Sequence, residues 1–399
     1  MSKNRESYPI EYWVNETKLP NNLSTTLKFQ EKENYTFLLT GSTGFLGGFN
    51  LKDLILNEKC NRVYCVVRSY QSFDQCKQIL KDSILKITTQ ELNDQHFNKI
   101  YPVKGDLTQF QLGLSSSDYE MISNQVDIII NVAAHVGYSS PYKKSKITNV
   151  DCIQRLLELA VSNKTSLKRI VHISTMAIFF DDKEIIENDN DLALLEKLNG
   201  KPGYFQSKAI AEYRYKEASK NGFEILLIRS PCLFCNSENG YGNTLDLFQL
   251  AIRTSLNEGK TVDCKFVPNF NTVPVDWFSR VMIKMTIDKN VWIEPFNAYN
   301  PSDSTYLRDY MQMIGNEFSL PELPMDEWLE FIKNSNHPTT QLTVNIFKYF
   351  GETFTKFNAP MSTKTKNYLK SINEYDGHKI TKTLLFKYIY ASFFSKSQT

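Results

Sequence analysis

The sequence lacks a long hydrophobic run, a dominant charge and a paired set of cysteines. No stretch of its 399 residues reaches the roughly 20 consecutive apolar residues that cross a bilayer. Residues 1–33 are polar and contain no apolar signal-peptide core. The formal net charge is only +2, and the seven cysteines are typical of reduced thiols inside a cell. These absences predict a cytoplasmic protein with no membrane span and no nucleic-acid partner.

Two short segments have patterns of other kinds. Cys232 and Cys235 have the spacing of a redox pair, but they follow the apolar run Ile225–Ile228, and chance explains the spacing better. The segment Leu384–Phe394 is apolar but short, and Lys387 interrupts it. It is predicted to be a buried helix, with a peripheral membrane contact as the alternative. No metal site is predicted.

The strongest pattern that is present is the glycine-rich segment Thr40–Gly47. It follows the apolar run Tyr35–Leu39 and opens an amphipathic stretch that ends near Leu56. A strand, a glycine turn and a helix in this order are typical of dinucleotide-binding folds. The glycines let the backbone approach the pyrophosphate, and the helix N-terminus offers it free N–H groups. The residues expected to contact the cofactor here are Thr40, Gly41, Thr43, Gly44, Phe45, Leu46 and Gly47.

Strands and helices are predicted to alternate after residue 33. The expected strands are Tyr35–Leu39, Arg62–Val67, Ile100–Val103, Val126–Asn131, Arg169–Ile173 and Glu224–Ile228. The helical patterns between them include Phe49–Leu56, Gln71–Lys86, Asn149–Val161 and Gln206–Ser219. The strands are continuous apolar runs, which suits a parallel sheet covered on both faces. The pattern predicts an α/β fold with a Rossmann-type doubly wound parallel sheet and a smaller, mostly helical C-terminal substrate domain.

The residue after the second strand predicts which dinucleotide binds. NAD-binding folds place an acidic residue about 20 positions past the glycines to hold the ribose hydroxyl. Here that place is taken by Arg68, which suits a 2′-phosphate, so NADPH is expected. Lys77 is either a second charge for that phosphate or a helix-surface lysine. The other residues expected to line the cofactor site follow the third to sixth strands and are Asp106, Leu107, Ala133, Ala134, Ser174 and Pro231.

Three regions are expected along the chain. Residues 1–33 form an N-terminal lead-in with a little helix around Glu11–Lys18. Residues 34–290 form the NADP-binding Rossmann domain, and its segment 237–270 is expected to contribute to the substrate domain. Residues 291–399 form the C-terminal domain for the substrate and its carrier.

The C-terminal part of the chain carries three further expectations. Asn271–Ile287 resembles a last strand and helix, and Trp292 and Trp328 are expected in the core. The tail 361–399 holds seven lysines and two acidic residues. These lysines are interpreted either as a solvated face without a partner or as a docking face for an acidic partner.

The candidate chemistry rests on a tyrosine and a lysine four residues apart. Tyr-x-x-x-Lys occurs three times, at Tyr142, Tyr204 and Tyr375, but only Tyr204 follows a strand that ends in hydroxyl residues and itself opens a helix. Tyr204 and Lys208 therefore share a helix face. A lysine charge ~5 Å away at an effective dielectric of ~20 stabilises a phenolate by ~3 kcal/mol. That amounts to ~2 pKa units, so the pKa of Tyr204 is expected to be lowered toward neutrality.

Two more residues complete the expected catalytic set. Thr175, at the end of the fifth strand, is expected to hold a carbonyl oxygen beside the phenol. Asn149 either orients Lys208 through water or caps a helix. His135 is a further candidate acid, although Tyr204 already fills that role. The predicted catalytic residues are Asn149, Thr175, Tyr204 and Lys208.

With these motifs in place, the chain resembles the extended short-chain dehydrogenase/reductase superfamily. It resembles in particular the thioester reductase domains that end polyketide and nonribosomal peptide synthetases. The resemblance runs from about Thr36 to Val275 and more weakly beyond. It rests on the cofactor loop, on Arg68, and on the following motifs: Gly105-Asp106-Leu107 with Leu112-Gly113-Leu114-Ser115, Pro141-Tyr142, Asn149-Val150, Gly203 to Lys208 with Ala211-Glu212, and Pro274-Val275-Asp276.

The resemblance implies Thr175, Tyr204 and Lys208 as a catalytic triad and NADPH as the hydride donor. It also implies an acyl thioester on the phosphopantetheine arm of an acyl or peptidyl carrier protein as substrate, reduced to an aldehyde and in some relatives on to an alcohol. The chain departs from the family at Gly137, at Ser230-Pro231-Cys232 after Arg229 and at Cys235, so substrate geometry near the nicotinamide stays open.

Alternatives follow from the same residues. A fatty acyl-CoA reductase shares the loop and the triad, and a non-catalytic NADP-sensing protein shares the fold. A sugar-nucleotide epimerase or dehydratase fits the motifs less well. Residues 180–203 are charged and loop-like and are expected to act as a lid. A free-standing protein and an excised terminal domain are both compatible with the chain.

Overall fold

Seven parallel strands form the central sheet of the computed structural model, which describes residues 7–137, 139–179, 193–263, 272–292, 296–297, 307–350, 363–375 and 380–394. Their order across the sheet is β10-β6-β5-β4-β1-β2-β3. Their bounds are β1 Tyr35–Thr40, β2 Cys60–Val67, β3 Ile100–Lys104, β4 Ile128–Asn131, β5 Arg169–Thr175, β6 Ile225–Ser230 and β10 Phe296–Asn297. The predicted doubly wound parallel sheet is confirmed, and the order reverses between β1 and β4.

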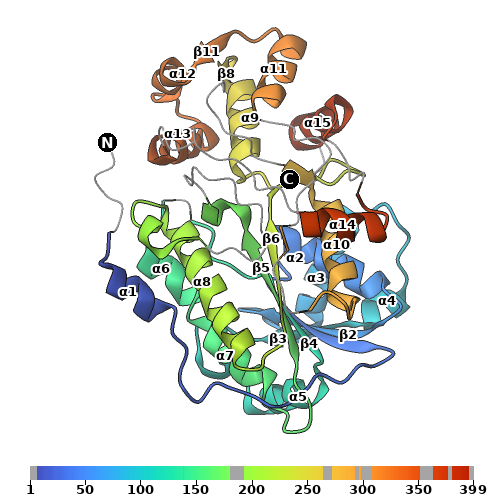
Figure 1. Cartoon of the computed structure of the whole chain (residues 1–399). Helices are drawn as coiled ribbons and strands as arrows, with labels where there is room; N and C mark the ends of the chain where they lie inside the picture. The colour runs from blue at the N-terminus through green and yellow to red at the C-terminus, as the bar shows by residue number, and fades with distance from the viewer. Residues whose placement is uncertain are drawn as a thin grey trace.

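Helices cover both faces of this sheet (Figure 1). Because successive strand residues point to opposite faces, Phe37 and Leu39 pack beneath one helical layer and Leu38 beneath the other. The first layer contains α2 Phe45–Leu56, α3 Phe73–Ile87, α4 Asp94–Asn98, α10 Val275–Ile287 and α14 Thr363–Ser371. The second contains α5 Ser116–Gln125, α7 Cys152–Ala160 and α8 Gly203–Lys220, with α6 Tyr142–Asn149 packed on α8. Burial on both faces explains why the strands are uniformly apolar.

Two sequence-based expectations about elements are confirmed with small changes. The helix predicted over Asn149–Val161 is α7, which begins at Cys152, while Asn149 is the last residue of α6. The strand and helix predicted over Asn271–Ile287 are β9 Thr272–Pro274 and α10, and β9 pairs with β7 Cys232–Phe234 in a separate small sheet. The seventh strand of the main sheet is instead β10, which pairs with Ile228 and Arg229 of β6.

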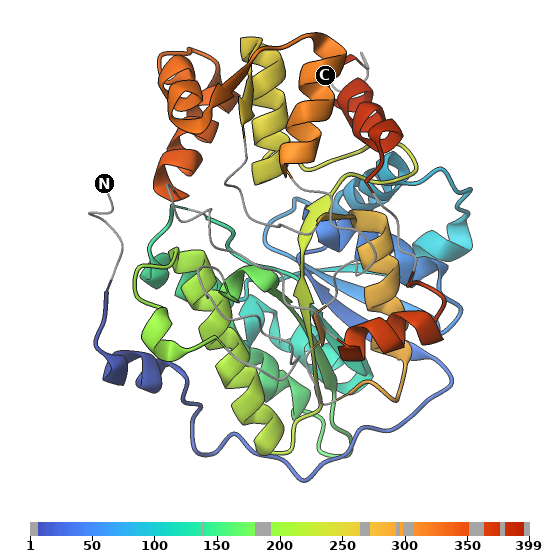
Figure 2. The same ribbon diagram turned by 45° about the horizontal axis from the view of Figure 1, so that its top comes forward.

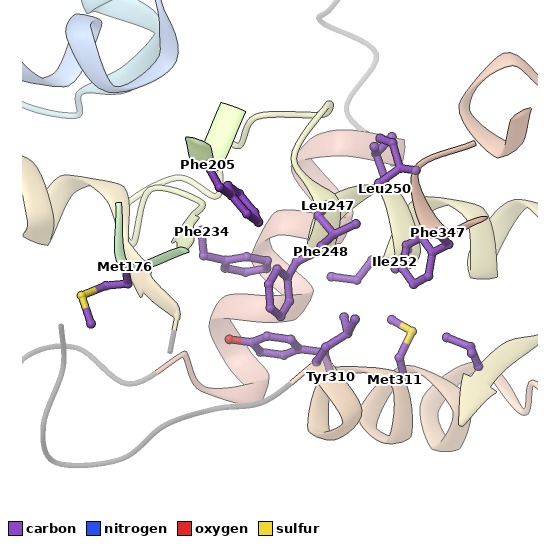
Figure 3. Packing of buried hydrophobic residues seen from close by; sticks show 14 of the residues in the cluster. Met176, Phe205, Phe234, Leu247, Phe248, Leu250, Ile252, Tyr310, Met311 and Phe347 are labelled. Carbon is purple, nitrogen blue, oxygen red and sulfur yellow. The ribbon is translucent and has the colours of Figure 1, made fainter. Parts of the chain in front are cut away.

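A layer of helices lies over the carboxyl ends of the strands (Figures 1 and 2). It consists of α9 Leu247–Glu258, β8 Thr261–Asp263, α11 Leu307–Phe318, β11 Glu322–Pro324, α12 Met325–Ile332, α13 Pro338–Phe350 and α15 Lys382–Ile389, which continues as a π-helical turn over Tyr390–Phe394. Phe248 of α9 and Tyr310 of α11 meet in its core, beside Phe234 (Figure 3). Segments far apart in sequence therefore build one helical layer, to which α9 contributes.

The N-terminal segment is fastened to the sheet domain. Its helix, α1 Ile10–Glu16, buries Trp13 against Tyr142, with ring centroids 5.0 Å apart. The chain then runs along the lower edge of the molecule as seen in Figure 1, and Thr25 N–H donates to Asn221 O over 2.9 Å. Trp292 and Trp328 are buried as expected. No helix among the described residues has the length and apolar character needed to cross a membrane.

The tail does not form one basic face. Lys364, Lys366 and Lys370 lie on α14, which packs against β10, whereas Lys382 and Lys387 lie on α15. Lys379 and Lys396 lie outside the described residues, as do residues 180–192 of the expected lid. The remaining part of that segment packs inward, since Leu198 is fully buried.

Candidate active site

A cavity of about 540 Å³ opens at the carboxyl ends of the strands, where the strand order reverses between β1 and β4. Doubly wound sheets bind their ligands at this point, because the loops of neighbouring strands leave in opposite directions there. All residues predicted to contact the cofactor line this cavity except Lys77, which is half-buried on α3. Of the predicted catalytic residues, Thr175, Tyr204 and Lys208 line it and Asn149 does not.

The glycine turn between β1 and α2 leaves no room for side chains. Gly41 has φ +75°, and a Cβ there would lie 2.8 Å from Ala133 N. A Cβ on Gly47 would lie 1.9 Å from Gly41 O, so the first turn of α2 packs directly on the strand end. The helix is preceded by Gly44 without a side-chain cap. Its first N–H groups therefore face the cavity as an anion-binding helix start.

The loop after β3 is held in a strained conformation at the edge of the cavity. Gln111 and Leu112 have φ values of +48° and +59°, which are uncommon for residues with side chains. Asp106 holds this loop: its N–H donates to Leu112 O over 2.6 Å, and its carboxylate accepts from Thr108 N and Oγ1. A Cβ on Gly113 would lie 2.8 Å from Asp106 N, which explains the spacing of this motif.

Three features of the lining fit a phosphorylated dinucleotide. Arg68 is exposed at the end of β2 and has no hydrogen-bond or ion-pair partner in the described part of the chain. Ser174 Oγ is buried in the cavity wall without a hydrogen-bond partner among the described residues. The bare backbone of the glycine turn supplies the third feature. A buried polar atom without a partner carries an energetic cost that a ligand relieves.

The candidate catalytic side chains are held by two packed helices. Gly203 lets α8 approach α6, because a Cβ there would lie 2.4 Å from Tyr142 N. This contact sets the first turn of α8 and places Tyr204 in the cavity wall, with Lys208 one turn further on. Thr175 ends β5, where its Oγ1 accepts the Ala177 N–H over 3.2 Å. The three predicted residues thus meet in one cavity with the glycine turn.

The expected lowering of the pKa of Tyr204 is not found. Burial raises the pKa of this phenol above its ordinary value, and the neighbouring Cys232 thiol adds to the rise. Burial also lowers the pKa of Lys208 to about 8. Lys208 does not lower the pKa of Tyr204, because its amine is directed elsewhere: Lys208 Nζ donates to Ile173 O over 2.5 Å and lies 3.0 Å from His172 Nε2. Tyr204 is therefore a neutral hydrogen-bond donor in this arrangement.

Asn149 connects two walls of the site rather than touching Lys208. Its Oδ1 accepts the His135 N–H over 2.7 Å, and its Nδ2 donates to His135 O over 3.2 Å and to Ser207 Oγ over 2.9 Å. Ser207 in turn donates to Tyr204 O. Asn149 therefore ties the loop after β4 to the first turn of α8, and it is a positioning residue by its contacts. His135 itself lines the cavity, and burial lowers its pKa.

Sequence reasoning missed the residues that the helical layer adds. These are Asn243, Asp246 and Leu247, at or just before the start of α9; Phe205 of α8 and Cys232 of β7 also line the cavity. Phe205 and Leu247 belong to the apolar cluster beneath the helical layer (Figure 3). Asp246 accepts the Phe248 N–H at the start of α9, and burial raises the pKa of its carboxyl to about 6. The only sequence signal for it is a helix-capping aspartate, a common feature that does not distinguish a site.

Comparisons with known proteins agree with this geometry. Residues 39–282 match the NAD_binding_4 family model, described as male sterility protein. Two Dictyostelium discoideum proteins are similar over most of the chain. Probable polyketide synthase 3 is 32% identical over 94% of this chain and 14% of its own length. Probable polyketide synthase 34 is 30% identical over 92% of this chain and 13% of its own length. The chain thus spans a small part of these relatives.

Solved structures resemble the whole chain. The terminal R domain from the myxalamid PKS-NRPS biosynthetic pathway aligns with a TM-score of 0.85 and 22% identity, covering 96% of this chain and 97% of that one. A thiolation-reductase di-domain from an archaeal non-ribosomal peptide synthetase aligns with a TM-score of 0.72 and 20% identity, covering 98% of this chain and 80% of that one. At these identities the likeness establishes the fold.

Proposed function

Because this chain belongs to the NAD_binding_4 family, described as male sterility protein, and has the extended short-chain dehydrogenase/reductase fold, we propose that it reduces an acyl thioester with NADPH. The product is an aldehyde, with further reduction to the alcohol as a second outcome. The substrate is an acyl chain on the phosphopantetheine arm of a carrier protein, with acyl-CoA as the alternative. The resemblance of the motifs to thioester reductases supports the reaction type.

The observation that carries this proposal is the position of Tyr204. Its side chain lines the same cavity as the glycine turn and Arg68, next to Thr175 and Lys208. Reduced nicotinamide, when bound, supplies the hydride. The glycine turn and the start of α2 would hold its pyrophosphate, and Arg68 would pair with the 2′-phosphate of NADPH.

The chain's own residues then stabilise the oxygen of the thioester carbonyl. Thr175 and Tyr204 donate hydrogen bonds to this oxygen as negative charge develops on it. Tyr204 supplies the proton, and Lys208 adds positive charge behind it at pH values at which its amine is protonated. The resulting hemithioacetal collapses by breaking its carbon–sulfur bond, which releases the aldehyde and the free thiol. Phe205 and Leu247 offer an apolar wall for the acyl chain.

Replacing Tyr204 with Phe tests the proposal. The variant is expected to lose about 100- to 10,000-fold in kcat, because it lacks the proton donor. Its affinity for NADPH should stay within a few-fold of wild type. Consumption of NADPH with an acyl thioester and binding of NADPH by fluorescence titration measure the two effects separately.

Tyr142→Phe is the matched control, since Tyr142 is the first residue of another Tyr-x-x-x-Lys pair. Its hydroxyl donates to Glu16 Oε2 over 2.7 Å and does not line the cavity. This variant should keep its turnover even where its stability drops. Undiminished turnover in Tyr204→Phe would overturn the proposed mechanism.

Mass spectrometry of products from a panel of acyl-CoA and acyl-carrier thioesters separates the remaining alternatives. Aldehyde from carrier substrates in preference to CoA substrates is the expected result. Preference for long-chain acyl-CoA would make the chain a fatty acyl-CoA reductase. Tight NADPH binding with no product from any thioester would instead indicate an NADP-sensing protein.

A further inference from the structure

A chain of buried polar side chains lies behind Lys208, on the side away from the cavity. The first contact in this series of side chains joins Lys208 to His172, with 3.0 Å between Lys208 Nζ and His172 Nε2. His172 Nδ1 lies 3.3 Å from Asn131 Nδ2, and Asn131 Oδ1 lies 2.8 Å from Thr40 Oγ1. All four side chains are buried, and neither His172 nor Asn131 lines the cavity. This series of hydrogen-bonded side chains connects Lys208, the candidate catalytic lysine, to Thr40, the residue that begins the glycine turn.

We propose that His172 is a positioning residue that holds Lys208 and ties its protonation state to Asn131 and Thr40. This inference rests on the proposed function of Lys208. His172 touches neither substrate nor cofactor, and its effect passes through the amine. The ring itself is held by Tyr215, whose ring centroid lies 4.6 Å away.

The hydrogen-bond directions start at the glycine turn. Thr40 Oγ1 accepts the Ala133 N–H over 3.2 Å, and its own proton goes to Asn131 Oδ1. The Asn131 amide nitrogen then faces His172 Nδ1 and donates to it. This leaves the imidazole proton on Nε2, where it points at Lys208 Nζ. Such an arrangement suits a neutral lysine amine, which accepts this proton in a hydrogen bond.

A protonated Lys208 demands the opposite arrangement. An ammonium has no lone pair, so Nε2 must accept from it and the ring proton must sit on Nδ1. The proton on Nδ1 would then face the amide hydrogens of Asn131 at close range. Flipping the side-chain amide of Asn131 would remove this clash, but the Thr40 hydroxyl would lose the oxygen to which it donates. The bonds from Thr40 therefore favour the neutral amine. Burial and the neighbouring Lys208 keep the pKa of His172 well below its usual range, so the ring stays neutral in both states.

Other titratable groups surround this chain of bonds. Cys152 approaches from α7, while Glu212 and Tyr215 approach from α8, on which Tyr204 lies one turn before Lys208. Glu212 is paired with Arg229 of β6 over 2.7 Å, both side chains being fully buried. Burial raises the pKa values of Cys152, Tyr204 and Tyr215, so these groups stay neutral while Lys208 titrates. A change in protonation of this group of residues near pH 8, the pKa of Lys208, is therefore the titration of the lysine.

Nitrogen NMR of the full chain labelled at histidine tests the proposal without catalysis. The sequence has five histidines, and the His172 signals are those absent from His172→Gln. As the pH rises through about 8, the protonated nitrogen of His172 should change from Nδ1 to Nε2 while the ring stays uncharged. A ring that keeps one tautomer from pH ~6 to ~10, or one that becomes charged in this range, would overturn the proposal.

Two isosteric variants and a pH profile give the second readout. Asn131→Asp accepts the Nδ1 proton and should move the alkaline limb of kcat/KM to higher pH. His172→Phe should lower kcat about 10- to 100-fold with KM changed less than about threefold, and His172→Gln should restore part of it, because its carboxamide oxygen accepts from the ammonium of Lys208 as Nε2 does. An unshifted limb in a folded Asn131→Asp protein would contradict the proposal. An inactive wild type with the expected tautomer change would count against the proposed function alone.

Discussion

At the scale of single residues, the proposed preference for NADPH rests on the charge at the end of β2. Arg68 is exposed, lines the cavity and has no partner in the described part of the chain. Lys77 was predicted as a second charge, but it lies on α3 outside the cavity lining. A 2′-phosphate contact therefore depends on one guanidinium.

Replacing Arg68 with Ser should weaken NADPH binding about 10- to 100-fold, because a charge-assisted hydrogen bond contributes about 1.5–3 kcal/mol. NADH binding should change little. Fluorescence titration with both cofactors measures the difference, and Lys77→Ala is the control, expected to bind NADPH as wild type does. Equal losses of NADPH and NADH affinity in the Arg68 variant would contradict the assignment.

Lys208 makes a residue-scale prediction about pH and stability. Its pKa is lowered to about 8 in the folded chain, against about 10.4 in an unfolded one. The unfolded chain thus binds the proton more tightly, and the free energy of unfolding rises with pH between these two values. The rise amounts to about 3 kcal/mol.

Lys208→Met isolates this contribution. At pH ~7 the variant should match or exceed the stability of wild type, because it buries no charge. Its advantage should shrink as the pH rises toward ~10. Urea unfolding of both proteins across this range measures the difference, and a difference independent of pH would refute the lowered pKa.

At the scale of elements, helix α2 contains two adjacent glycines, Gly47 and Gly48, and only Gly47 packs against the turn that follows β1. A Cβ on Gly47 would lie 1.9 Å from Gly41 O, whereas one on Gly48 would lie 3.7 Å from Ile87 Cδ1. Both glycines are helical and buried, but only the first faces backbone. The pair offers a matched test of why the turn needs glycine.

Gly47→Ala should destabilise the chain and abolish measurable NADPH binding, because the helix must move away from the turn. Gly48→Ala should keep binding and gain up to about 1 kcal/mol of stability from the better helix former. Thermal unfolding and NADPH titration of both variants check this. Similar behaviour of the two alanines would show that close packing at the turn does not matter.

At the scale of the whole molecule, the proposed carrier protein would have to approach the cavity across an exposed basic face. Helix α14, which holds three tail lysines, lies away from the cavity: its Tyr368 and the next residue after the helix, Ile372, share a shallow depression with Tyr35, at the start of β1. Helix α6 supplies Thr148 to the cavity lining and exposes Lys143 and Lys144. We therefore expect an acidic carrier to meet α6, and α14 to be a solvated face.

Reversing the charge at Lys143 and Lys144 to Glu should raise KM for a carrier-bound thioester about tenfold, equivalent to about 1.4 kcal/mol. KM for a small thioester should not change. The matched control reverses Lys366 and Lys370 on α14 and should leave both KM values unchanged. A larger effect from the α14 pair would favour the tail as the docking face.

Much of the fold and part of the site were predictable from sequence, because their signals are local. Apolar runs bounded by helical patterns predicted six strands of the sheet. The glycine turn could be read from its spacing, and Tyr204 with Lys208 from their spacing together with their place after a strand that ends in hydroxyl residues. The residues lining the cavity from β1 to β6 followed because the carboxyl ends of parallel strands meet at one edge.

Tertiary packing decided the rest. The bond between Lys208 and His172, the clamp from Asn149 to His135, and the place of β10 join residues that sequence spacing does not relate. The helical layer likewise gathers α9, α11 and α15 from segments far apart in the chain. The pKa of Tyr204 shows the consequence: sequence predicts a charge four residues away, but burial and the direction of the amine depend on the whole packed structure, and they raise the pKa instead.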